Sequence, residues 1–140
     1  MSNYIKESKY EIKKSVFPLS KIFKGFVFAN KIYLRPDIYN DLYKDKPKPE
    51  SVGVLIHERT HLEQISSGNW LIQGLRYWIF PKVRLESELL ANREQFKYLK
   101  RNKEIFDFEK RAKHLSSFPY LFCSSYQSAL KELRKIWRNV

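Results

Sequence analysis

One short run of residues limits the possible folds of this chain more than any other. Residues 57–61 read His-Glu-Arg-Thr-His, within a segment that predicts a helix from about Pro49 to Ser66. Two histidines four residues apart project from the same side of a helix, so both rings can bind one metal ion. Glu58 would then lie beside the ion, where its carboxylate can take a proton from water. Imidazole nitrogens suit zinc; the alternative is a pair of helix histidines with ordinary hydrogen bonds.

A metal ion needs a third ligand from elsewhere in the chain. A second long helix is predicted from Pro81 to about Lys103. Steps of three and four residues place Glu88 on its apolar side, whereas Glu86 falls on a mixed face. A buried carboxylate needs a positive partner, so we predict Glu88 as the third ligand. A buried salt bridge from Glu88 to an Arg or Lys is the alternative, and His114 is expected to be a surface residue.

The other segments predict an α+β fold that is mainly helical. Residues 25–34 should form two antiparallel strands around a turn at Ala29 and Asn30, in a small sheet packed on the helix with the two histidines. Residues 70–80 predict an apolar helix capped by Asn69; we expect it to be buried, with a membrane-surface anchor as the alternative. Residues 1–14 predict a loose arm or a short helix, and residues 125–138 a C-terminal helix that packs on the core.

Composition and charge narrow the class of protein. The chain has 140 residues, which suits one domain, and its hydrophobic content of 43% is that of a folding protein. Cys123 is the only cysteine, so a four-cysteine zinc site is excluded and a cytoplasmic protein is favoured. No stretch is apolar for long enough to predict a transmembrane segment. The net charge of +12 makes nucleic acid or an anionic surface a candidate partner.

The histidine run and the later glutamate together resemble the gluzincin metallopeptidases, in which HExxH on one helix is completed by a glutamate on another. Residues 26–61 look like the core of the CAAX prenyl protease and heat-shock membrane protease type. Residues 88–92, Glu-Leu-Leu-Ala-Asn, resemble that group's ExxAD segment. The size is similar to that of the soluble minigluzincins. The resemblance covers about residues 16–100 of a single zincin-like metallopeptidase domain that we expect to span residues 1–140.

The resemblance implies one Zn²⁺ per chain, with ligands His57, His61 and Glu88, and with Glu58 as general base and later acid. Asn92 stands where the family has an aspartate that orients a ligating imidazole, so its amide oxygen is expected to accept the ring N–H. Thr60 stands where many members have glycine.

These observations predict a small soluble zinc metalloendopeptidase that cleaves peptide or protein substrates. A substrate strand would lie antiparallel along the free edge of the sheet, and Tyr77, Arg76 and Tyr33 are candidate donors to the oxyanion. Two alternatives remain open. One is a nucleic-acid-associated basic protein on a zincin scaffold. The other is a latent or inactive metallopeptidase with residues 1–14, or the helix after Ser125, in its cleft.

Overall fold

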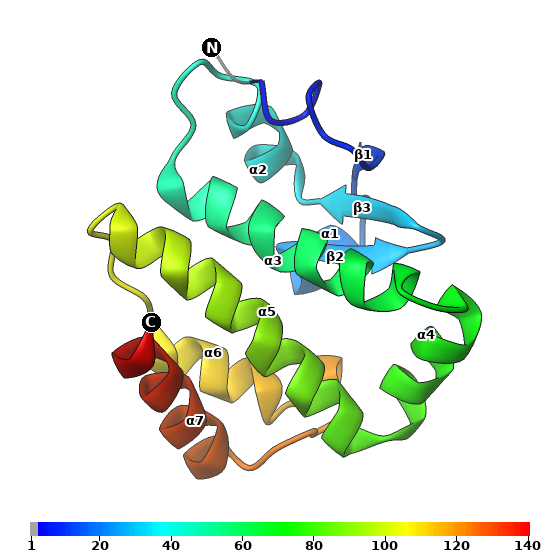
Figure 1. Cartoon of the computed structure of the whole chain (residues 1–140), viewed down its shortest axis with the longest axis vertical. Coiled ribbons are helices and arrows are strands. Elements are labelled where there is room, and N and C mark those ends of the chain that lie inside the picture. The colour runs from blue at the N-terminus through cyan, green and yellow to red at the C-terminus, as the bar shows by residue number, and fades with distance from the viewer. Residues whose placement is uncertain (1–2) are drawn as a thin grey trace.

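The computed structural model describes residues 3–140 and contains a small sheet beside a larger set of helices (Figure 1). The strands are β1 (Ile12–Lys14), β2 (Gly25–Phe28) and β3 (Lys31–Leu34). The helices are α1 (Leu19–Ile22), α2 (Pro36–Asp41), α3 (Pro49–Ser66), α4 (Trp70–Ile79), α5 (Pro81–Arg101), α6 (Phe108–Leu115), the 3-10 turn η1 (Phe118–Tyr120) and α7 (Tyr126–Asn139). The predicted α+β, mainly helical class is confirmed.

The strand pair around residues 29 and 30 forms as predicted. β2 and β3 pair antiparallel, with Phe28 opposite Lys31. Ala29 and Asn30 join them with φ angles of 48° and 64°. Two consecutive positive φ values are what a two-residue hairpin turn requires, because its twist then matches that of the strands.

The sheet also has a strand that the sequence did not predict. β1 pairs parallel with β3, in the order β1-β3-β2, so the sheet is mixed rather than antiparallel. The expected loose arm at residues 1–14 is therefore wrong for the part that forms β1. Ile12 is the buried residue of this strand and joins the core below the sheet, which explains why so short and charged a segment is held. The strand order leaves β2 at one edge of the sheet.

The long helices α3 and α5 lie side by side, with the sheet against the other side of α3 (Figure 1). α3 runs over the predicted range, and α5 begins at the predicted proline. One hydrophobic core lies between the sheet, α2 and α3, and a second lies between α5, α6 and α7. The contact between α3 and α5 therefore separates two cores, and polar side chains are buried along it.

The helix predicted at residues 70–80 forms, but its predicted burial is wrong. Asn69 caps α4 as expected, since its side chain accepts hydrogen bonds from the backbone N–H groups of Leu71 and Ile72. Every residue of α4 is exposed or half-buried. Within residues 3–140, no helix is long and apolar enough to cross a membrane.

Candidate metal centre

The two histidines and the glutamate converge where α3 meets α5. His57 and His61 lie on adjacent turns of α3, with ring centroids 4.8 Å apart. Glu88 reaches them from the second turn of α5 and is 2% exposed. Its Oε2 lies 3.2 Å from Nε2 of His57, and its Oε1 lies 3.1 Å from Nε2 of His61. These three residues form a group that could hold a metal ion, with ligand atoms all within 4.8 Å of one another.

The spacing of the donor atoms fits a small tetrahedral ion. The two Nε2 atoms of the histidines are 3.1 Å apart. Ligand atoms at about 2.0–2.1 Å from a tetrahedral ion are separated by roughly 3.3 Å. The separation of the two ring nitrogens therefore needs to widen by only a small amount to admit an ion, and each ring nitrogen has one oxygen of Glu88 at a similar separation, Oε2 for His57 and Oε1 for His61.

The outer nitrogen of His61 is held in the way a metal ligand requires. Its Nδ1 lies 3.1 Å from Oγ of Ser87 and 3.2 Å from Oε1 of Gln64. The Ser87 hydroxyl donates to the Gln64 carbonyl oxygen, so both oxygens can accept from an N–H on Nδ1. A proton on Nδ1 leaves the lone pair of Nε2 facing His57 and Glu88.

His57 is neutral at pH 7, since burial lowers its pKa to about 4 despite the hydrogen bond to Glu88. Its Nδ1 has no hydrogen-bond partner among residues 3–140, and neither has Oδ1 of Asn92. The Asn92 amide group instead donates to the backbone carbonyl of Glu88 at 2.7 Å. The expected bond from an imidazole to Asn92 is therefore not formed, and within the described residues Nδ1 of His57 and Oδ1 of Asn92 are both buried without a hydrogen-bond partner.

Glu88 also has two partners that the sequence analysis did not assign to it. The Tyr77 hydroxyl of α4 donates to Oε1 at 2.6 Å, and the Arg111 guanidinium of α6 donates to Oε2 at 2.7 Å. Burial alone would raise the pKa of Glu88, but His61, His57 and Arg111 hold it well below its usual range. The ion pair that we considered as the alternative for Glu88 thus exists beside the two histidines.

Arg111 is the residue of this site that sequence reasoning missed. Its guanidinium lies 3.2 Å from Nε2 of His57, donates to the Tyr120 hydroxyl at 3.1 Å and rests on the Tyr120 ring. In the sequence it lies in a basic, amphipathic segment with no motif, which gave no signal that its half-buried side chain turns inward. His114, in the same helix, lies outside the three-residue group; it is half-buried against Phe23 and Tyr120 rather than on the surface.

Glu58 lies next to this group and faces the sheet. It is 6% exposed, and its side chain packs against Gly25 of β2, where an added Cβ would lie 2.8 Å from its Cγ. Burial raises the pKa of Glu58 to about 7. Of the predicted oxyanion donors, Tyr77 is bonded to Glu88, Arg76 is exposed on α4, and Tyr33 stacks on Phe26 with centroids 5.1 Å apart.

Neither family models, curated proteins nor solved structures give a match to this chain. The buried donor atoms of His57, His61 and Glu88 are therefore what indicates the chemistry of this chain.

Proposed function

We propose that this protein is a zinc metallopeptidase of the gluzincin type that hydrolyses peptide bonds. The observation that carries the proposal is the meeting of His57, His61 and Glu88, from two different helices, in one buried group of donor atoms. Two imidazoles and one carboxylate form the ligand set of many hydrolytic zinc sites, which keep a fourth position for water.

Zinc is the metal that this donor set favours, since the group offers two borderline nitrogen ligands and a single carboxylate, with no thiolate. When bound, zinc would lower the pKa of a water molecule and polarise the carbonyl of the scissile peptide bond. The protein's own residues then have to move one proton and hold the substrate.

Glu58 is assigned the proton transfers. It follows His57 directly on α3, so its carboxylate lies beside the ligand group, and the raised pKa near 7 suits a residue that accepts and returns a proton at neutral pH. It takes the proton of the attacking water and gives it to the leaving amine. Tyr77 and Arg111 keep Glu88 ionised and fixed in position through their two hydrogen bonds.

The free edge of β2 is assigned to the substrate. β2 lies at one edge of the sheet, and its residue Gly25 packs against Glu58. An extended peptide that adds to this edge would run close to the carboxylate that moves the proton. The missing side chain at Gly25 allows this close approach between the strand and α3.

Metal analysis tests the ligand set. We expect one zinc per chain in the purified protein, loss of the metal in His57→Ala and at least tenfold weaker binding in Glu88→Ala. Glu86→Ala is the matched control, because Glu86 lies on the same helix but is exposed and pairs only weakly with Lys82. Retention of stoichiometric zinc by Glu88→Ala, or a metal-free parent protein after zinc reconstitution, would refute the proposed site.

Activity on an unfolded protein substrate tests the role of Glu58. The variant Glu58→Gln should bind zinc like the parent but lose at least a hundredfold in kcat, since an amide cannot accept the proton. If Glu58→Gln cleaved at the parental rate, Glu58 would not be the base.

The Arg111 contact favours a second candidate function, a latent form of the same enzyme. Its guanidinium approaches Nε2 of His57, which is the ligand atom itself, and supplies positive charge where zinc would. Neither β1, which belongs to the first expected latent segment, nor α7, the helix after Ser125, is in this position, since β1 lies at the far edge of the sheet and α7 packs on α5 and α6.

One variant separates the two candidates. In a latent form, Arg111→Met should raise zinc affinity and activity at least tenfold, because a competing cation is removed. In the active form, the same change should lower zinc affinity, because Glu88 loses a partner that positions it. Arg134→Met is the control, with an equal charge change at an exposed pair with Glu109.

A further inference from the structure

α4 presents its apolar side to solvent. Its outward residues are Leu71, Ile72, Leu75, Trp78 and Ile79, each between 52% and 61% exposed. At 100° per residue, these five positions fall within an arc of about 120° on the helix, so they form one continuous strip. We refer to these five residues as the α4 stripe. An amphipathic helix of a globular protein normally packs such a strip against the protein core. In α4 the strip is exposed to solvent, which is typical of a site that binds another molecule or a membrane.

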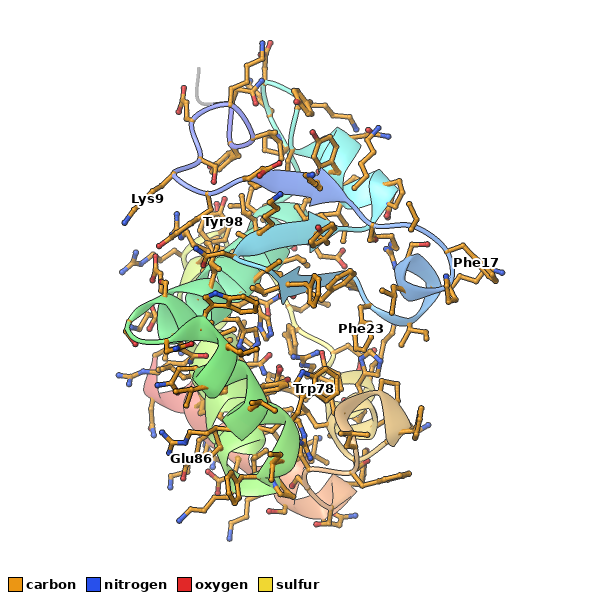
Figure 2. The ribbon with its side chains drawn as sticks, turned by 90° about the vertical axis from the view of Figure 1, so that its right-hand side faces the viewer. Lys9, Phe17, Phe23, Trp78, Glu86 and Tyr98 are labelled. Atoms are coloured by element: carbon orange, nitrogen blue, oxygen red, sulfur yellow. The ribbon has the colours of Figure 1, made fainter. Side chains whose placement is uncertain are left out.

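The opposite side of α4 is hydrogen-bonded to the rest of the protein. Tyr77 points the other way and donates to Glu88, and the backbone carbonyls of Tyr77 and Trp78 accept from Arg84 of α5. Rotation of the helix to bury the α4 stripe would break these bonds. α4 lies at the right-hand side of Figure 1, the side that faces the viewer in Figure 2, where Trp78 is labelled.

The charge around the α4 stripe is positive. From Ile65 to Leu85 the chain contains no Asp or Glu, while Arg76 on the helix and Lys82 just after it are both exposed. In residues 3–140, no carboxylate lies within salt-bridge distance of Arg76. The whole chain carries a net charge of +12. A partner that covers the α4 stripe should therefore be apolar within and negatively charged at its surface.

We infer that α4 binds the surface of an anionic lipid bilayer, with the helix axis in the plane of the membrane. Trp78 and its aliphatic neighbours enter the boundary between headgroups and acyl chains, and Arg76 and Lys82 remain among the phosphates. This inference does not depend on the proposed metal chemistry.

The size of the α4 stripe favours a membrane over a second copy of the chain. A ten-residue helix is about 15 Å long, so its outer half covers only a few hundred Å², against about 800 Å² on each partner of a stable protein interface. A lipid surface needs no matching shape and accepts a small apolar area that positive charge supplements.

Vesicle binding tests the inference. The full chain should sediment with vesicles of phosphatidylcholine containing 30% phosphatidylglycerol, and at least tenfold less with phosphatidylcholine alone. Leu75→Glu should weaken binding to the anionic vesicles at least tenfold. Ile105→Glu is the matched control, with the same change in charge at a side chain that is 92% exposed outside α4, and it should bind within threefold of the parent.

A fluorescence measurement on folded protein checks the depth of insertion without a charged substitution. The chain has tryptophans at positions 70, 78 and 137, so Trp70→Phe with Trp137→Phe leaves Trp78 as the single reporter. Brominated anionic lipids should quench Trp78 strongly. The reciprocal variant, with Trp137 as the only tryptophan, should show little quenching, since Trp137 packs on Phe96 and Phe108 in the second core.

Three results would overturn the inference. The first is absence of binding to anionic vesicles by the folded parent protein. The second is equal binding by Leu75→Glu and the parent. The third is a dimer in sedimentation velocity that Leu75→Glu dissociates and vesicles do not, which would assign the α4 stripe to a second copy of the chain.

Discussion

The close contact between β2 and the proposed base offers the sharpest test of how the sheet positions Glu58. In Gly25→Ala, the new Cβ would lie 2.8 Å from Cγ of Glu58 and 3.0 Å from Cδ2 of Leu34. Ordinary contact begins at 3.4 Å, so the Glu58 side chain or the strand has to move by about 0.6 Å. Both neighbours are in the packed interior, where such a move cannot be absorbed without cost.

Overpacking by one methyl group costs about 1–3 kcal/mol, which should lower Tm by roughly 3–10 °C in a chain of this size. A misplacement of about 1 Å costs on the order of a hundredfold in rate, so kcat should fall at least tenfold. Zinc affinity should remain within about threefold of the parent, because Gly25 approaches Glu58 rather than the three ligands.

Three measurements follow the variant: Tm by circular dichroism, zinc by chelator competition, and kcat on an unfolded protein. Gly74→Ala is the control, since a Cβ there meets nothing within 4 Å. In the middle of α4 it should leave kcat unchanged and stabilise the protein by about 0.5–1 kcal/mol. If folded Gly25→Ala kept the parental kcat, the close contact with Gly25 would not position Glu58. If zinc affinity fell by the same factor as kcat, the variant would disturb the ligands rather than Glu58.

Four further predictions concern metal and stability. Removal of zinc by a chelator should lower Tm by roughly 10 °C when free zinc had been near a thousand times Kd, and His57→Ala should abolish this difference in a thermal scan. Asn92→Asp should tighten zinc binding about tenfold in chelator competition, by placing a carboxylate beside the proposed ligands, while lowering the Tm of the metal-free protein. Arg84→Met should cost about 2–5 kcal/mol in urea unfolding, because the buried guanidinium donates to backbone carbonyls of α4 and of residues 120 and 121. Asp41→Asn should lower the free energy of unfolding by about 1–2 kcal/mol at pH 7. The pKa of Asp41 is lowered to about 2, because hydrogen bonds from the Lys44 side chain and the Lys48 backbone outweigh the effect of burial, which alone would raise it. A carboxyl group with a lowered pKa stabilises the folded protein at pH values above its unfolded-state pKa, which is near 4, and this stabilisation is lost as the pH falls toward 2. The difference in unfolding free energy between Asp41→Asn and the parent should therefore shrink between pH 4 and pH 2.

The parts of this structure that the sequence predicted are those with local signals. α3 and α5 have prolines at their first turns, and the hairpin has a turn that tolerates positive φ. Glu86 and Glu88 lie on different sides of α5, because they are two residues apart on a helix. The helical periodicity therefore predicted that Glu88, and not Glu86, is the buried carboxylate.

The parts that it missed depend on contacts between distant segments. Arg111 reaches Glu88 across 23 positions, and nothing in a basic helix shows which of its cations turns inward. β1 has three residues and gains its place by pairing with β3, which its own propensity does not predict. The apolar pattern of α4 predicted a helix with one apolar side, but a pattern cannot tell whether the protein or something else covers that side.

α4 lies between the two proposed sites, with Tyr77 on one side of the helix and the exposed residues of the α4 stripe on the other. A bilayer that held the helix in one orientation would also fix the phenol that donates to Glu88, the proposed third zinc ligand. If vesicles change the affinity for the metal, thermodynamic reciprocity requires that the metal change the affinity for vesicles by the same factor. Coupling between a membrane and the proposed hydrolytic centre would then require no domain movement, because one ten-residue helix contacts both.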